Sequence, residues 1–271
     1  MSHWRSFVCG LALLTPWSAV ARAGLTASEI MWEAQQQLSV PAESALGEMD
    51  VYRGDTPLRH YAFVLGKLWE PQTTTESVRI DFETAINSAP DSASLYPHHR
   101  YLLKRTAETP PSQWLYLPAL RRVRITPYHP DDPLVQSHYL FYDLTTILDF
   151  DDYRYRFVDA SEQAPVVEGE PQTAFVPYQR TVFSLERRGG TYLVTQMTYV
   201  GRDTERQARF LDFREIAPRR FRPGVVVVEG DGGRTEIRFR HWAIHTPRPQ
   251  LFTPAALETR MLEVPLESTD E

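Results

Sequence analysis

The chain has 271 residues, a formal net charge of −6 at pH 7 and one cysteine, Cys9. This length suits one large β domain or two small ones, and no linker divides the sequence. A net-acidic chain is a poor candidate for sequence-independent binding of nucleic acid, which relies on positive charge against phosphate. The composition therefore argues against a nucleic-acid partner, and a single cysteine cannot form a disulfide within the chain.

Residues 1–23 have the pattern of a cleavable secretory signal. Arg5 gives a short basic start, residues 7–14 form an apolar core, and Ala21-Arg22-Ala23 is an A-x-A cleavage site. The apolar run is too short to cross a membrane as a helix. We expect an exported, periplasmic protein that begins near Gly24, lacks cysteine and has a net charge of −8, since two arginines leave with the signal.

The next segment predicts an amphipathic helix over residues 27–38. Thr26 or Ser28 can cap it, and its apolar residues share one side at i, i+1, i+4 and i+8, namely Ile30, Met31, Ala34 and Leu38. Such a stripe normally packs against a sheet.

Two strands are expected between residues 60 and 85, and a further strand between 100 and 105 after a turn-rich connection at 88–97. In the second strand, Val78, Ile80 and Phe82 alternate with three charged residues, Arg79, Asp81 and Glu83. This alternation predicts that one face of the strand is exposed to water.

Residues 113–124 read QWLYLPALRRVR. The run Trp114-Leu115-Tyr116-Leu117 predicts a strand buried on both faces, and Pro118 ends it because proline has no N–H to donate. A cationic turn with Arg121, Arg122 and Arg124 is expected to follow.

The middle of the chain is irregular. Residues 127–133 hold three prolines and cannot be regular structure, and residues 134–150 predict a short helix or a loop with one helical turn. Residues 153–158 alternate as a strand, whereas residues 160–177 predict a mobile loop.

The last third has the clearest β pattern, with a strand at 206–213 and two hairpins. The hairpins join 181–186 to 192–199, and 225–228 to 235–242, around glycine-rich turns. A short helix should begin near Thr253, and the tail after Glu263 should be frayed. With nine to eleven strands in all, the chain predicts a mainly β (α+β) fold, a strongly curved antiparallel sheet with helices on one face.

No pattern of residues indicates an enzyme. Adjacent His98 and His99 point to opposite faces of a strand, which disfavours a shared metal ion, and His241 and His245 lack the glutamate of a zinc-protease motif. Nucleophile-elbow, phosphate-loop and dinucleotide motifs are absent from the sequence. We therefore expect no catalytic residue, no metal and no cofactor; a hydrolase with an unfamiliar site is the least favoured hypothesis.

Two segments resemble the periplasmic outer-membrane lipoprotein-sorting (LolA-like) family. The first has a W-x-Y-x-P-x-x-R-R-x-R pattern, matched by Trp114, Tyr116, Pro118, Arg121, Arg122 and Arg124. The second is aromatic and acidic, matched by Phe141, Tyr142, Asp143 and Leu144, although Gln136-Ser137-His138 replaces the usual Gly-Ser-Asp lead-in. The resemblance implies one domain over residues 24–271, an open half β-barrel with a few helices on its concave side.

A long sheet with few helices has more apolar surface than it can bury, and a hydrophobic cavity for an acyl chain accounts for the surplus. The expected cavity residues are Trp114, Leu115, Tyr116, Leu117, Tyr139 and Phe141. At the rim, Arg121, Arg122 and Arg124 can bind a phosphate headgroup or an acidic partner, or remain a solvated surface.

The leading functional hypothesis is a periplasmic carrier of lipid or lipoprotein acyl chains that works without covalent catalysis. The resemblance implies an inner-membrane exporter of the resistance-nodulation-division type as donor and an outer-membrane acceptor. The alternative is an envelope adaptor or scaffold that uses the same sheet to bind a protein.

Overall fold

The computed structural model describes residues 24–85, 98–107, 109–145, 148–202, 204–259 and 261–264. The predicted signal at 1–23, the predicted connection at 88–97 and the tail beyond residue 264 lie outside the described residues.

The described chain is dominated by one large antiparallel sheet. Its strands are β1 (Ala42–Arg53), β2 (Thr56–Glu70), β3 (Thr75–Ala85), β4 (Arg100–Thr106), β5 (Ser112–Leu117), β6 (Arg122–Thr126), β7 (Tyr153–Asp159), β8 (Val166–Pro171), β9 (Arg180–Arg188), β10 (Thr191–Val200), β11 (Glu205–Leu211), β14 (Val225–Gly230) and β15 (Gly233–Ile244). Their order is β6-β5-β4-β3-β2-β1-β15-β14-β11-β10-β9-β8-β7. A separate two-stranded sheet pairs β12 (Arg214–Ala217) with β13 (Arg220–Arg222).

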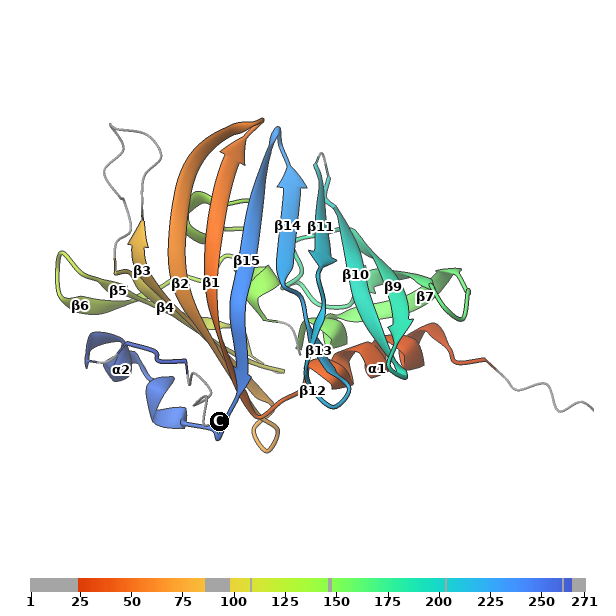
Figure 1. Ribbon diagram of the computed structural model, residues 1–271, viewed down its shortest axis with the longest axis horizontal. Helices are drawn as coiled ribbons and strands as arrows, with labels where there is room; N and C mark the ends of the chain where they lie inside the picture. The colour runs from red at the N-terminus through yellow and green to blue at the C-terminus, as the bar shows by residue number, and fades with distance from the viewer. Residues whose placement is uncertain are drawn as a thin grey trace, which may run out of the picture.

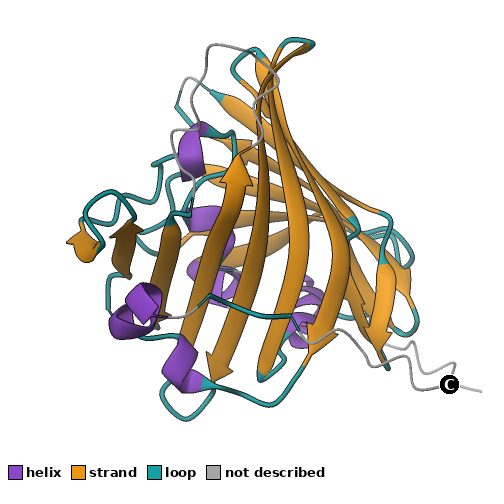
Figure 2. Cartoon of the chain, turned by 60° about the vertical axis from the view of Figure 1, so that its left-hand side comes forward, coloured by secondary structure: helices purple, strands orange, loops and turns teal. Residues whose placement is uncertain are grey.

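The large sheet bends strongly but does not close into a barrel. Its end strands, β6 and β7, lie at opposite sides of the molecule in Figure 1, and each pairs with one neighbour among the described strands. The curvature is also visible after a 60° turn (Figure 2). The predicted mainly β, open half-barrel architecture is confirmed.

Helices cover both faces of the sheet. On the concave face lie α1 (Ala27–Leu38) and three short 3₁₀ helices, η1 (Leu134–Gln136), η2 (Tyr142–Leu144) and η3 (Leu148–Asp152). On the convex face lie η4 (Pro249–Leu251) and α2 (Pro254–Thr259). The C-terminal helix therefore differs from the expectation that the helices gather on the concave side.

The first helix has the predicted bounds, and Thr26 is its cap. The Thr26 hydroxyl accepts from the Glu29 N–H, and the Glu29 carboxylate accepts from the Thr26 N–H at 2.7 Å. This reciprocal capping box satisfies two N–H groups that a helix start leaves unpaired. Ile30, Met31 and Ala34 are buried against the sheet, as the apolar stripe predicts.

The convex face of β3 is buried at Arg79 and Asp81, so the prediction that this face is exposed to water was wrong for these two residues, whereas Glu83 is exposed as predicted. Arg79 and Asp81 are both 0% exposed and form a bidentate pair, with both N···O distances at 2.8 Å. The C-terminal segment covers them: Arg79 donates to the Leu251 carbonyl at 2.7 Å, and Asp81 accepts from the Leu262 N–H at 2.7 Å. Charged residues occupy this face because the covering backbone and the pair satisfy each other.

Three strands of the large sheet, and both strands of the small sheet, were not predicted from the sequence. β1 lies at the centre of the sheet, β6 includes Arg122 and Arg124 from the expected cationic turn, and β8 occupies part of the expected loop at 160–177. Strand β8 has few apolar residues, but Val167 is 0% exposed and Gly169 lies beneath the rings of Tyr153 and Phe183. Pairing with β7 and β9 outweighs its weak local pattern.

The strand that contains Trp114 is β5, one position from the edge of the sheet. Its residues 114–117 are half-buried, so the prediction of burial on both faces was wrong. A strand next to the edge has only one further strand to shield it, which leaves its side chains partly exposed.

Candidate functional site

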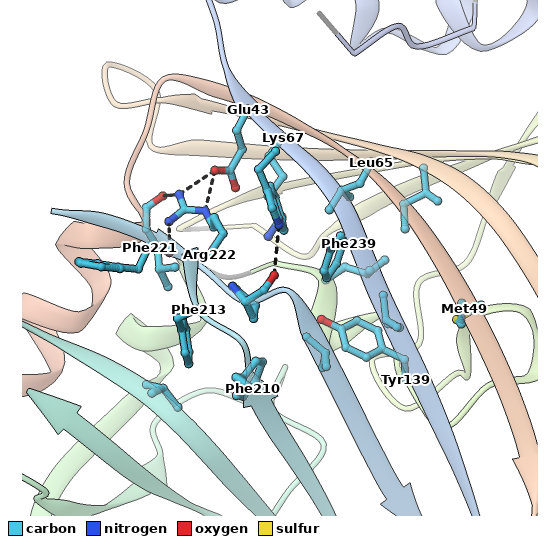
Figure 3. Close-up of a pocket in the computed structure, with 18 of the residues that line it drawn as sticks. Glu43, Met49, Leu65, Lys67, Tyr139, Phe210, Phe213, Phe221, Arg222 and Phe239 are labelled. Atoms are coloured by element: carbon cyan, nitrogen blue, oxygen red, sulfur yellow. Dashed lines mark hydrogen bonds and ion pairs between the residues drawn. The ribbon is translucent and has the colours of Figure 1, made fainter. Parts of the chain in front are cut away.

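The candidate site is a cavity of about 150 Å³ on the concave face of the sheet. Apolar side chains from distant parts of the sheet form most of its wall, among them Met49, Phe63, Leu65, Ile80, Phe210 and Phe239. Figure 3 shows Met49, Leu65, Tyr139 and Phe239 around the apolar part of the pocket. A concave, mainly apolar space with a few polar groups is typical of a site for a small apolar ligand.

Aromatic rings pack against one another in the apolar wall. The Phe63 ring lies 6.1 Å from Phe239, at 90°, and 6.1 Å from Phe82. Gly47 of β1 permits this arrangement, since a Cβ atom there would lie 2.4 Å from the Phe63 ring. A glycine therefore stands in β1 where an apolar side chain would collide with the Phe63 ring.

Residues 127–145 and 148–152, here called the inner segment, cover part of the concave face. At one end Arg105 of β4 forms ion pairs with Asp149 and, at 2.5 Å, with Asp152. Burial alone would lower the pKa of Arg105, but the two aspartates raise it. The pairs therefore attach η3 firmly to the β4 side of the sheet.

The middle of the inner segment is attached to β11. Arg206 donates to the His138 carbonyl, to the Tyr178 hydroxyl and, at 3.1 Å, to Asp143. Tyr178 in turn donates to Asp143 at 2.8 Å. Leu134, Tyr139 and Leu144 of the inner segment line the cavity.

One end of the cavity is polar. Glu43 of β1 and Arg222 of β13 form a buried ion pair at 2.7 Å, with side chains 4% and 3% exposed. Arg222 also donates to the carbonyls of Gln37, Leu38 and Phe221. Its guanidinium therefore fixes the end of α1 against the start of β1, and Gln37, Glu43 and Arg222 all line the cavity.

Lys67 of β2 also faces this polar end, as Figure 3 shows beside Glu43 and Arg222. Burial lowers the pKa of the Lys67 ammonium, and Glu76 and Glu43 partly oppose this effect. A charged amine inside a mainly apolar cavity is costly to hold without water or an anionic neighbour.

The six predicted cavity residues are not gathered at one place. Tyr139 lines the cavity, and its hydroxyl donates to the Asp143 carbonyl at 2.7 Å. Phe141 and Leu115 belong to the concave core without lining the cavity. Trp114 and Tyr116 face the convex side, where they pack against the cluster that holds Phe252 and Leu257, and Leu117 is half-buried at the end of β5.

The three predicted rim arginines lie together at the β5–β6 hairpin, in one edge of the sheet. Arg121 occupies the turn with φ of 49°, and Arg122 and Arg124 follow in β6. All three side chains are exposed, and within the described residues none forms an ion pair.

Sequence reasoning missed the polar end of the cavity. The sequence offers one signal for it: Lys67 is one of two lysines, and it interrupts the alternating apolar pattern of β2. Glu43 and Arg222 give no such signal, because they are far apart in the chain and meet only in the folded state.

Other functional features can be stated only for the part of the chain that the structure describes. There, His, Cys, Asp and Glu form no group of three or more that could hold a metal ion. No helix within the same ranges has the length and apolarity needed to cross a membrane.

The fold is similar to three solved structures. A domain assigned to outer-membrane lipoprotein sorting from Vibrio parahaemolyticus is 18% identical, with a TM-score of 0.71 over 86% of this chain and 99% of that chain. A DUF1329 family protein from Desulfovibrio piger is 18% identical, with a TM-score of 0.72 over 85% and 97%. A LolA superfamily protein from Nitrosomonas europaea is 12% identical, with a TM-score of 0.61 over 85% and 98%.

These similarities and the open, curved sheet define the class: this is a LolA-like half-barrel. No curated protein matches the sequence. A family model described as "Uncharacterized protein" matches residues 98–259, more than half of the chain, and the chain belongs to that family.

Proposed function

We propose that this protein is a periplasmic carrier that takes up the acyl chain of a lipid or lipoprotein in the concave cavity and moves it towards the outer membrane. The observation that carries this proposal is the cavity itself, whose wall is mainly apolar. A scaffold that binds proteins through the sheet has no need of such a space. The carrier proposal is also supported by the structurally similar domain from Vibrio parahaemolyticus, which is assigned to outer-membrane lipoprotein sorting.

Transfer by such a carrier requires no covalent step. Moving an acyl chain from a membrane into an apolar cavity exchanges one apolar environment for another, whereas exposure to water costs roughly 0.8 kcal/mol per CH₂. The carrier therefore lowers the barrier for crossing the aqueous space. Non-catalytic action without a cofactor is part of the proposal.

The cavity must enlarge to admit a long chain. Its volume of about 150 Å³ matches that of an engineered protein cavity that binds benzene, well below the space that a long acyl chain fills. We expect the inner segment to move, because Leu134, Tyr139 and Leu144 of this segment line the cavity and the segment is not a strand of the sheet. Tyr139 would then contact the ligand directly.

The exposed hairpin arginines Arg121, Arg122 and Arg124 are proposed as the surface that meets a donor or acceptor. An inner-membrane exporter of the resistance-nodulation-division type and an outer-membrane acceptor are the partners proposed. Residues from Gly24 onward would act as one domain, because strands from both halves of the described chain join in one sheet.

A cavity-filling variant tests the carrier proposal. Val194 lines the cavity, so Val194→Phe should weaken binding of the uncharged fluorescent probe N-phenyl-1-naphthylamine by about 10-fold or more, with a stability change of about 1 kcal/mol or less. Val158→Phe is the matched control, since Val158 is 58% exposed on β7. Absence of probe binding by the unmodified protein, or equal binding by both variants, would contradict the proposal.

A further inference from the structure

The charged groups that line the cavity lie at one end of it. Glu43, Lys67 and Arg222 converge there with the Gln37 amide, while the opposite end is formed by apolar and aromatic side chains (Figure 3). The cavity therefore has a polar end and an apolar end. A ligand that is apolar along its whole length does not match it, whereas an amphiphile with one polar head does.

Charge balance at the polar end indicates the sign of that head. Glu43 and Arg222 neutralise each other at 2.7 Å, and Arg222 is further occupied by backbone carbonyls of Gln37, Leu38 and Phe221. The ammonium of Lys67 adds a second cation, so the charged groups lining the cavity sum to one positive charge.

Glu76 does not line the cavity. It borders a small neighbouring hollow that Glu43 and Lys67 also border, and it is 1% exposed. Its carboxylate offsets part of the cost of the Lys67 charge. Burial still lowers the pKa of Lys67 despite Glu76 and Glu43, so the folded protein holds this ammonium at a cost.

We infer that the cavity binds a single-headed amphiphile whose anionic head, a carboxylate or a phosphate, lies beside Lys67 while its acyl tail extends towards Phe239. This inference rests on the proposed function and names its ligand class. An anionic oxygen beside Lys67 accepts a hydrogen bond from its ammonium, and such charge-assisted bonds are strong inside an apolar cavity. A cationic head would meet Lys67 and Arg222 and be rejected.

The test compares ligands that share one tail. Displacement of N-phenyl-1-naphthylamine from the full-length mature protein is measured with hexadecanoate, hexadecyl phosphate and the uncharged 1-hexadecanol. We expect an anion to bind about 10- to 100-fold more tightly than the alcohol, the range for a hydrogen bond to a charged group. The stronger of the two anions shows whether a free fatty acid or a phosphate headgroup is the better match.

Variants locate the head. Lys67→Met should bring anion affinity to within about 3-fold of alcohol affinity, whereas Lys104→Met, the control on the convex face of β4, should keep the preference. Glu76→Gln removes the opposing carboxylate and should increase the preference for an anion. If circular dichroism shows that Lys67→Met does not fold, Glu76→Gln tests the position of the head independently.

The outcomes separate the two proposals. Equal binding of anion and alcohol by the unmodified protein, or a preference unchanged by both Lys67→Met and Glu76→Gln, overturns the inference about the head but leaves the carrier in place. Failure of all three ligands and the probe to bind overturns both.

Discussion

The concave and convex faces of the sheet are both covered by segments that buried arginines hold in place, and the cavity of about 150 Å³ lies under the concave cover. On the convex face, Arg79 and Asp81 are 0% exposed and bind the backbone of the C-terminal segment. Phe252 and Leu257 of that segment fill the space against Leu68 and Leu102 of the sheet.

On the concave face, Arg105 holds one end of the inner segment and Arg206 holds its middle. Between these attachments the cover does not fill the space above Phe63 and Phe239, which line the cavity. The comparison shows that ion pairs fix where a cover lies, whereas the bulk of its apolar side chains decides whether it leaves room for a ligand.

The largest expected effect is on the convex face. Arg79→Met should reduce the free energy of unfolding by about 3–5 kcal/mol, because it leaves the buried Asp81 carboxylate without its guanidinium. Urea unfolding measures the change. Arg240→Met is the control, since Arg240 is 69% exposed in its pair with Glu48 and should contribute about 1 kcal/mol or less. A loss below about 1 kcal/mol for Arg79→Met would show that this pair does not anchor the cover.

The concave cover should respond to pH through Asp149. Burial raises the pKa of this carboxyl, with Arg105 opposing, so the folded state binds the proton more tightly than the unfolded state. The stability that this carboxyl contributes is therefore complete below its unfolded pKa, about 3.9, and is lost as pH rises through the folded pKa.

Asp149→Asn removes this titration. Between pH 4 and 7, the unfolding free energy of the unmodified protein minus that of the variant should fall with rising pH, by up to about 1.4 kcal/mol per pH unit. Asp55→Asn, with a side chain that is fully exposed, is the matched control. A difference that stays constant or grows with pH contradicts the expected direction.

The smallest expected effect is on α1, which forms part of the concave cover. Thr26→Ala removes the hydroxyl of the capping box and should lower the free energy of unfolding by about 1 kcal/mol. Ser28→Ala is the control, because Thr26 provides the cap. In Thr26→Ala, hydrogen exchange should become faster in α1 and stay unchanged in α2. Equal losses of unfolding free energy in Thr26→Ala and Ser28→Ala would show that the Thr26 cap does not stabilise α1.

The sequence alone determined the features that depend on neighbouring residues. The cap and apolar stripe predict α1 with its observed bounds, and the glycine-rich turns predict the β9–β10 and β14–β15 hairpins. These signals are complete within a few residues, because capping and tight turns are local interactions. The mainly β, curved architecture followed from the sum of such signals.

Only the tertiary structure decided which polar residues are buried and where the cavity lies. Glu43 and Arg222 are separated by 179 positions, and Arg79 reaches a carbonyl 172 positions away. Charged side chains normally indicate exposure to water, and these become buried because distant groups satisfy them. Partners that far apart leave no local pattern, so the polar end of the cavity forms only when the fold brings β1 and β2 of the large sheet together with β13 of the small sheet.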